Sequence, residues 1–422
     1  MHILFLTDNF PPEVNAPAAR THEHCRCWVR AGHRVTVITG SPNFPSGRPH
    51  PGYGNPLWRR ERLDGIAVVR VWTYISANEG LLRRSLDYAS YMAAAVLAAP
   101  FVRDVDVVVA TSPQIFTACA GAVIGALRRK PFVFELRDLW PESIRAVGAV
   151  RNAAVLAGLE RLELFLYRRA AAIVTVTRAF RDNLVRRGVD GGRIAVVTNG
   201  ADLSRFVPRS RDAALADDLG LTGRFVCGYV GTHGMAHCLD TVLDCALRLQ
   251  AHPQGRDIRF LFVGDGAEKA ALQARAQALG LTTVLFLGAV SREEVPRYWS
   301  VLDASIVHLK AADLFTTVIP SKLFEALAMG VPVLHGVRGE SAGMVEAAGA
   351  GLLFAPEDAE ALAEVVLKLA GDAALRTQMG DRARQAALRY DRTALAADML
   401  AVIERAALTT ASSLSLAAAV AA

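Results

Sequence analysis

The chain has 422 residues, of which 52% are hydrophobic and 21% charged, a composition ordinary for a globular protein with two buried cores. The formal net charge of +6 does not by itself select one kind of anionic partner. None of the six cysteines forms a CxxC pair, which argues against a zinc site. No apolar run reaches membrane-spanning length without interruption, and the first residues lead directly into a predicted strand rather than a signal peptide.

Short β-rich runs alternate with helical stretches in the first half of the chain. Strands are predicted at residues 2–7, 34–39, 67–72, 105–110, 132–135, 172–176 and 194–197, and helices at 16–31, 81–99, 114–128, 152–169 and 179–187. This alternation is typical of a doubly wound parallel sheet.

The pattern restarts after a polar stretch at 206–223. Strands are predicted at 225–230, 259–263, 284–287, 304–307, 332–335 and 351–354, and helices at 239–250, 267–279, 295–301, 321–329 and 359–370. The sequence therefore predicts an α/β protein with two Rossmann-like doubly wound parallel-sheet domains and a ligand in the cleft that they face. The expected division is 1–205, 206–385, a helix at 386–407 that crosses back to the first domain, and a disordered tail at 408–422.

The segment 319–334 has the features of an anion-binding helix. Pro320 stands where a missing N–H is harmless, Ser321 is expected to cap the helix, and the free N–H groups of the first turn suit a phosphate. Lys322 adds a positive charge, and Glu325, one turn on, accepts hydrogen bonds from a pair of ribose hydroxyls. The alternative is an ordinary capped helix.

This segment resembles the donor-binding signature of family-4 retaining glycosyltransferases of the GT-B fold, in the branch that builds bacterial surface polysaccharides such as O-antigen, capsule and exopolysaccharide. Five further stretches agree in the expected order: 8–13 followed by 32–37, then 111–113, 137–143, 199–202, and 229–234 with 264–266. The resemblance implies transfer of a hexosyl or N-acetylamino sugar group from a nucleoside diphosphate sugar, UDP-linked, to a lipid-linked glycan, with retention of configuration.

The chain departs from the family pattern at several positions. Thr317 stands where many members have the first glutamate of a Glu-x7-Glu pair, and Glu325 matches the second. Arg137 stands where many have histidine, and Cys238 replaces a frequent glycine.

The stretch after residue 229 is rich in small residues, and its glycines allow the backbone to approach a phosphate closely. His233 is expected to hydrogen-bond a diphosphate oxygen, the alternative being a tight turn with a solvated histidine. By resemblance, the backbone near Val290 meets the nucleobase. The predicted donor-binding set is Gly231, Thr232, His233, Gly234, Val290, Ser321, Lys322, Leu323 and Glu325.

A second group of candidates lies in the first half of the chain. The stretch 137–142 follows an apolar strand, and a charged pair beside an aromatic ring suits sugar recognition. Asp138 is a candidate general base or acceptor ligand, or half of a structural Arg–Asp pair, and Arg20 either reaches the cleft or solvates its helix face. The predicted acceptor-side set is Asn15, Ala16, Arg20, Arg137, Asp138, Trp140 and Glu142, and the predicted catalytic set is Asp138, Lys322 and Glu325.

No metal and no other cofactor are expected, because the Asp-x-Asp at 104–106 opens a buried strand and no acidic or histidine cluster stands elsewhere. No nucleic-acid partner is expected. The apolar stretch 80–97 begins with Arg83 and Arg84, a pattern that suits either a buried helix or contact with an anionic membrane. The expected location is the cytoplasm, at the inner face of the cytoplasmic membrane.

Two other functions fit the same architecture. A UDP-sugar 2-epimerase would bind the same nucleotide but need acid and base carboxylates and no acceptor. A non-catalytic sugar-nucleotide-binding protein is the second, because the first family glutamate is missing. An oxidoreductase is disfavoured, because no G-x-G-x-x-G follows the first strand.

Overall fold

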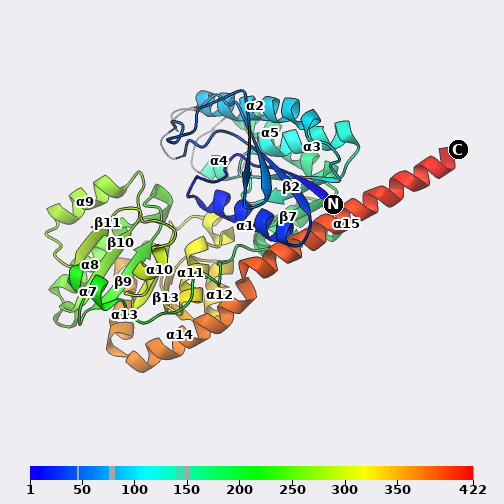
Figure 1. Ribbon diagram of the computed structural model, residues 1–422. Helices are drawn as coiled ribbons and strands as arrows, with labels where there is room; N and C mark the ends of the chain where they lie inside the picture. Colours follow the sequence, from blue (N-terminus) through cyan, green and yellow to red (C-terminus); the bar gives the residue numbers. More distant parts are fainter. Residues whose placement is uncertain (45–46, 76–80, 141, 147–151, 422) are drawn as a thin grey trace. The chain divides into compact units, whose positions relative to one another are not determined.

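The computed structural model describes the chain except residues 45–46, 76–80, 141, 147–151 and 422. The chain divides into two compact units, Met1–Thr198 with Thr393–Ala422, and Asn199–Arg392 (Figure 1). The chain leaves the first unit at 198/199 and returns at 392/393, whereas the sequence placed these points at 205/206 and 385/386. The outgoing and returning segments are bonded to each other: Ala201 N donates to Tyr390 O, and Arg392 N donates to Ala201 O.

The first unit contains a twisted sheet of order β3-β4-β2-β1-β5-β6-β7-β8, parallel except for the β3–β4 pair. Its strands are β1 (His2–Leu6), β2 (Arg34–Thr39), β3 (Trp58–Leu63), β4 (Ile66–Val71), β5 (Val107–Thr111), β6 (Phe132–Leu136), β7 (Ala172–Thr175) and β8 (Ile194–Val196). Its helical segments are α1 (Ala16–Arg30), α2 (Leu81–Ala98), η1 (Ala99–Phe101), α3 (Ile115–Arg128), α4 (Glu142–Ala146), α5 (Ala153–Arg169), α6 (Arg178–Arg186) and η2 (Gly191–Arg193). The central strands are buried because helices cover both faces of a parallel sheet.

Strand β3 was not predicted. Its sequence, WRRERL, is highly charged, and the strand lies at the sheet edge, where charge is tolerated because one side lacks a neighbour. The available signal was the Asp64-Gly65 turn into β4, in which both residues have positive φ (49° and 82°). This dipeptide is the preferred two-residue connection of a hairpin.

The second unit contains a fully parallel sheet of order β11-β10-β9-β12-β13-β14. Its strands are β9 (Phe225–Val230), β10 (Ile258–Val263), β11 (Val284–Leu287), β12 (Ala304–His308), β13 (Val333–Gly336) and β14 (Gly351–Leu353). Its helical segments are α7 (Ala213–Asp218), η3 (Met235–His237), α8 (Asp240–Ala251), η4 (Pro253–Gly255), α9 (Lys269–Ala278), α10 (Val295–Trp299), η5 (Asp313–Thr317), α11 (Ser321–Met329), α12 (Glu340–Ala348), α13 (Ala359–Gly371), α14 (Ala373–Ala387) and η6 (Leu388–Tyr390). The predicted pair of doubly wound parallel sheets is confirmed.

Each sheet has a point where the strand order reverses direction. In the first unit it lies between β1 and β5, and in the second between β9 and β12. The loops that leave the carboxyl ends of two such strands diverge to opposite faces and leave a crevice, which is where doubly wound sheets bind their ligands. The functional side chains are therefore to be sought at these two places.

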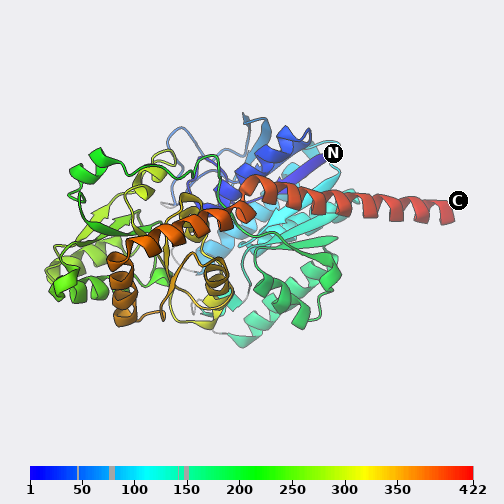
Figure 2. The same cartoon turned by 90° about the horizontal axis from the view of Figure 1, so that it is seen from below.

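The last helix, α15 (Arg392–Ala421), lies along the first unit in both views (Figures 1 and 2). Trp28 Nε1 donates to Ala396 O at 2.8 Å. The apolar residues that α15 adds to the core beside α1 are Leu395, Met399, Val402, Ile403 and Ala406. The tail expected to be disordered continues as the end of this helix, and its side chains from residue 410 lie outside the described residues. In the described part of the chain, no helix is both long and apolar enough to span a membrane.

Substitution of Met399 tests how much the packing of α15 contributes to the stability of the first unit, because this side chain is fully buried in its core. We expect Met399→Ala to lower the free energy of unfolding by about 2–5 kcal/mol, from lost burial and the cavity left behind. Leu408, on the same helix and 69% exposed, is the matched control, and Leu408→Ala should change little. Equal effects of the two substitutions in urea denaturation would show that the helix does not contribute to this core.

Candidate active site

In the second unit, the start of α11 lies beside the loop that leaves β9. The Lys322 ammonium nitrogen sits 3.6 Å from the ring centroid of Tyr229, on β9. A Cβ atom built on Gly231 would lie 3.5 Å from the same nitrogen. The fold therefore brings the two predicted phosphate-binding elements, about ninety residues apart in the sequence, to one point at the reversal of the strand order.

Lys322 is a buried cation without a direct polar partner. Its residue is 8% exposed, and its ammonium group has no hydrogen-bond partner. Burial lowers its pKa to about 7, against the opposing influence of Glu325. A buried charge without a hydrogen-bond partner is costly, and the aromatic face of Tyr229 compensates for this cost only in part. The site is therefore electrostatically prepared for an anion.

Glycines allow the loops at this point to pack closely. Gly231 has a φ of 138°, a backbone conformation that L side chains rarely adopt. A Cβ at Gly264 would lie 2.0 Å from Gly231 O, and a Cβ at Gly266 would lie 2.3 Å from His233 O. The loop after β10 is thus pressed against the loop after β9, and His233 N donates to Asp265 O at 2.8 Å. Gly264 and Gly266 therefore support the loop after β9, because they allow the loop after β10 to contact its backbone directly.

His233 lies inside an aromatic cluster. Its side chain has no exposed surface, and its ring centroid is 5.8 Å from that of Tyr229, 6.0 Å from Phe262 and 6.3 Å from Phe286. Burial, then Lys269 and Lys322, lowers its pKa to about 4, so the ring is neutral. The predicted contact between this imidazole and a diphosphate would require the ring to leave the cluster. In this arrangement the loop would bind through its backbone.

The N-cap of helix α11 lies one residue earlier than predicted, at Pro320 instead of Ser321. Pro320 occupies the N-cap position with φ −61° and ψ 130°, and no side chain caps the helix. Ser321 is therefore the first helical residue, and its predicted capping role is wrong, because Pro320 already holds the extended conformation that a cap needs. Leu323 is fully buried in the core, and its N–H donates to Pro320 O, so it offers a donor nucleotide neither its side chain nor its N–H.

The remaining donor-side candidates lie around the same edge of the sheet. Glu325 is half-buried on α11, one turn after Lys322. Val290 follows β11 and packs partly against the core, and Thr232 is exposed in the loop after β9. Thr317, at the position of the missing family glutamate, donates its hydroxyl to Leu314 O within η5.

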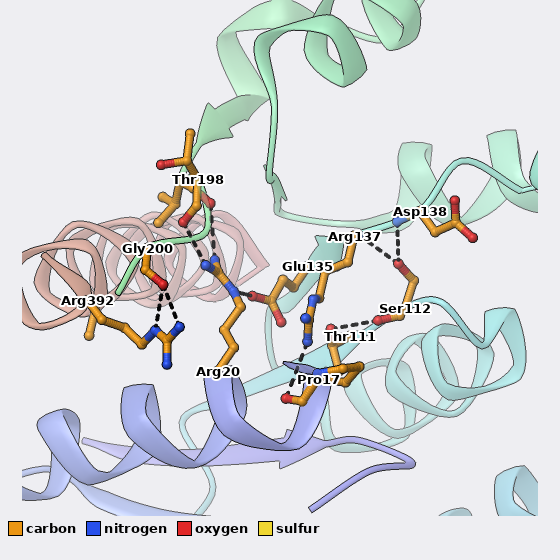
Figure 3. A network of polar contacts seen from close by, with 12 residues as sticks. Pro17, Arg20, Thr111, Ser112, Glu135, Arg137, Asp138, Thr198, Gly200 and Arg392 are labelled. Atoms are coloured by element: carbon orange, nitrogen blue, oxygen red, sulfur yellow. Dashed lines mark hydrogen bonds and ion pairs between the residues drawn. The ribbon is translucent and has the colours of Figure 1, made fainter. Parts of the chain in front are cut away.

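In the first unit, Arg20 is held in a buried ion pair (Figure 3). Its Nε lies 2.9 Å from Glu135 Oε1, and its two terminal nitrogens donate to Thr198 O and Val197 O. Burial alone would raise the pKa of Glu135, but Arg20 and Arg137 hold it below its usual value. The interpretation that Arg20 solvates its helix face is wrong, because the residue is 2% exposed. Its contacts connect α1 to β6 and to the end of β8.

Ser112 organises the segment that carries Arg137 and Asp138. Its hydroxyl oxygen accepts from Arg137 N at 2.7 Å and from Asp138 N at 3.2 Å, and Arg137 Nη1 lies 3.4 Å from Pro17 O (Figure 3). Arg137 and Asp138 are both half-buried at the carboxyl end of β6. Residues that follow β5 and β6 and the start of α1 are thereby brought together.

The other acceptor-side candidates have structural contacts. Asn15 caps α1 by accepting from Ala18 N, and it donates to Asn9 Oδ1 at 2.7 Å. Ala16 is exposed at the first position of that helix. Trp140 packs partly against the core, and Glu142 accepts from Asn183 Nδ2 on α6 at 3.2 Å. Trp140 and Glu142 therefore make structural contacts within the first unit. They are not part of the group of residues bonded to Ser112.

Two doubly wound parallel sheets, each with a reversal of strand order, define a protein of the doubly wound α/β class, whose members bind ligands at the carboxyl ends of the strands. Residues 15–200 match the family described as glycosyl transferase 4-like domain, and residues 217–386 match the family described as glycosyl transferases group 1. The chain belongs to the glycosyltransferases that combine these two domains, and it has the GT-B fold.

Curated relatives and solved structures agree with this assignment. The putative colanic acid biosynthesis glycosyl transferase WcaI of Escherichia coli (strain K12) is 26% identical over 344 residues, which cover 78% of this chain and 82% of that protein. Sucrose-phosphate synthase from Thermosynechococcus elongatus superimposes with a TM-score of 0.73 at 18% identity, covering 96% of this chain and 98% of that one. Anabaena HepE, solved in complex with UDP and glucose, gives a TM-score of 0.71 at 18% identity, covering 95% and 99%.

The Arg20–Glu135 pair predicts a pH-dependent contribution to stability. Arg20→Ala leaves a carboxylate buried without its partner and should cost about 3–5 kcal/mol in urea denaturation at pH 7. Because the folded pKa of Glu135 is lowered, this contribution is present above the ordinary value of 4.5 and is lost as the pH falls through the folded pKa.

Arg161→Ala, at an exposed position of α5, is the control for lost arginine charge. The double variant Arg20→Met with Glu135→Leu should recover most of the lost stability, because apolar residues can replace a buried pair. A small loss for Arg20→Ala, equal to that of the control, would contradict the buried pair.

In the protein without ligand, the buried charge of Lys322 is expected to lower the free energy of unfolding, whereas the Arg20–Glu135 pair raises it. Its folded pKa of about 7 lies below its ordinary 10.5, so the unfolded state holds this proton more tightly and folding is penalised at neutral pH. Lys322→Met keeps the stem over Tyr229 and should raise the free energy of unfolding by roughly 1–4 kcal/mol. The gain should shrink as the pH rises from 7 towards 10.5.

Lys368→Met, exposed on α13, should show no such gain. Destabilisation by Lys322→Met at pH 7 would mean that the ammonium group has an anionic partner in the folded protein.

Proposed function

We propose that the protein transfers a hexosyl or N-acetylamino sugar group from a UDP-linked sugar to a lipid-linked glycan during bacterial surface polysaccharide synthesis, with retention of configuration. The observation that carries the donor half of this proposal is the buried ammonium of Lys322, unpartnered between the glycine loop and the start of α11. A diphosphate supplies the missing negative charge and accepts hydrogen bonds from the uncapped first turn of α11.

Each donor-side residue has a separate role in the proposal. Lys322, Ser321 and the 231–234 loop bind the diphosphate, the loop through the N–H groups of Thr232 and Gly234, because those of Gly231 and His233 donate to Val263 O and Asp265 O. Glu325 accepts hydrogen bonds from the ribose hydroxyls. The backbone near Val290 meets the base. As the bond to the sugar breaks, negative charge grows on the leaving diphosphate, and the same ammonium and N–H groups stabilise it. The proposal involves no metal ion and no other cofactor.

The acceptor half rests on the first unit. Asp138 is held by Ser112 at the carboxyl end of β6, and it is proposed to orient the acceptor hydroxyl, with Arg137 beside it. Support for the substrate classes comes from relatives: WcaI is named for colanic acid biosynthesis, and HepE was solved with UDP and glucose. Retention follows the resemblance to family-4 enzymes.

A location at the inner face of the cytoplasmic membrane is part of the proposal. Helix α2 carries Arg83 and Arg84, both exposed, at its start. Exposed apolar side chains follow on the same helix and on η1: Leu86 at 49%, Leu97 at 73% and Phe101 at 65%. Cationic and apolar side chains on one segment suit an anionic lipid surface.

The donor site predicts how UDP binding depends on pH. Since the charged form of Lys322 binds the diphosphate and its free pKa is about 7, UDP affinity should fall as the pH rises above 7, by up to about tenfold per pH unit. Lys322→Met should weaken binding at pH 6.5 and remove this pH dependence. Glu325→Ala should weaken binding at every pH, since it removes the ribose contact.

Isothermal titration calorimetry with UDP measures the affinity of the wild-type protein, Lys322→Met and Glu325→Ala as a function of pH. Lys368→Met and Glu364→Ala, at exposed positions of α13, are the controls. Wild-type affinity in Lys322→Met would exclude the proposed diphosphate site.

The reaction itself is tested by incubation with UDP-sugars, with and without a lipid-linked saccharide. We expect a glycosylated lipid only when the acceptor is present. Rapid formation of an epimer from UDP-sugar alone would favour the isomerase, and UDP binding without either product would favour a non-catalytic protein.

A further inference from the structure

The first unit has a partly open cavity at the reversal of its strand order. Its volume is about 290 Å³, at the lower end of the range for small-molecule sites. Four separate segments line it: the loop after β1, the loop after β2, one face of α2, and the loop after β5. The predicted acceptor-side set contributes Asn15, but the charged side chains of this cavity were not among the predicted residues.

The charges that line the cavity are mostly negative. Asp8 follows β1, Glu13 follows in the same loop, and Asp87 comes from α2. Arg84 is the cation among the lining residues, and it is exposed. Burial, then Asp87 and Glu13, raises the pKa of Asp8 to about 7, and burial raises that of Asp87 to about 6 against the influence of Arg84.

Two buried side chains in the cavity wall each have one polar atom without a partner. Glu13 is 6% exposed; its Oε1 accepts from Asn43 N and Phe44 N, both at 2.9 Å, while its Oε2 accepts no hydrogen bond. Gln114 is 3% exposed; its Oε1 accepts from Thr117, while its Nε2 donates to nothing. Buried polar atoms are normally paired. A sugar hydroxyl both donates and accepts, so one hydroxyl group can satisfy the carboxylate oxygen and another the amide nitrogen.

We propose that this cavity binds the sugar end of the acceptor and selects a neutral or amine-bearing saccharide over an acidic one. The inference rests on the proposed glycosyl transfer and specifies its acceptor. Hydroxyl groups satisfy Glu13 Oε2 and Gln114 Nε2. An ammonium group on the sugar would be attracted by Asp8 and Asp87, whereas a uronate or phosphate would be placed against three carboxyl groups.

The selectivity is measured by saturation-transfer NMR on the full chain, with methyl glucoside, methyl glucosaminide and methyl glucuronide titrated separately at pH 8 and no UDP present. We expect the glucuronide to bind at least about tenfold more weakly than the other two, because like charges oppose each other. In Asp87→Asn, and in Asp8→Asn as a second variant, the difference should fall to about threefold or less. Both substitutions remove like-charge repulsion, and thermal unfolding verifies that the variants fold.

Asp182→Asn, at an exposed position of α6, is the matched control and should keep the wild-type selectivity. Equal or tighter binding of the glucuronide, unchanged selectivity in both cavity variants, or no saccharide binding would overturn the inference. UDP titrated into the same samples tests the proposed function separately from the acceptor cavity. The cavity variants should keep wild-type UDP affinity. Absence of UDP binding in the wild-type protein would count against the proposed function alone.

Discussion

The proposed donor site depends on one unfavourable interaction, the burial of the Lys322 ammonium without a hydrogen-bond partner. The aromatic face of Tyr229 lies 3.6 Å away and offers only a weak, partial compensation. A fold keeps such a charge only if the rest of the unit is stable enough to tolerate it. The parallel sheet and its two apolar layers provide that stability. In the proposed function, the diphosphate offsets the desolvation cost that the buried ammonium carries in the free protein.

The glycines around Lys322 follow from the same requirement. A diphosphate needs backbone N–H groups within hydrogen-bond distance, and a Cβ on Gly231 would occupy the space next to the ammonium. Gly264 and Gly266 let the neighbouring loop press against the backbone of Gly231 and His233, which holds the binding loop from behind. The buried His233 ring contributes to this support through aromatic packing. The loop after β9 is therefore closely packed against the loop after β10.

The first unit uses charge in two different ways. The Arg20–Glu135 pair is saturated by partners within the unit and connects α1, β6 and the end of β8. The carboxyl groups around the cavity after β1 are not neutralised in this way, and Glu13 keeps an unpaired oxygen. A saturated pair stabilises a fold, while an unsaturated group in a cavity wall is available to a ligand. Burial and charge alone would not distinguish these two cases; the hydrogen-bond partners do.

The sequence by itself determined the two doubly wound sheets, because alternating apolar strands and amphipathic helices report local periodicity. It also indicated α11 and the glycine loop, because Pro-Ser-Lys and closely spaced glycines are local signals. It did not predict the edge strand β3, in which charged residues obscure the alternation of apolar and polar positions, or that Pro320 and not Ser321 occupies the N-cap position of α11. Only the tertiary structure decided that Arg20 meets Glu135, that His233 is enclosed by Phe262 and Phe286, and that Asp8 and Asp87 share a cavity. These pairs are far apart in the chain, and their distances are set by sheet order and helix packing, which no local pattern of residues records.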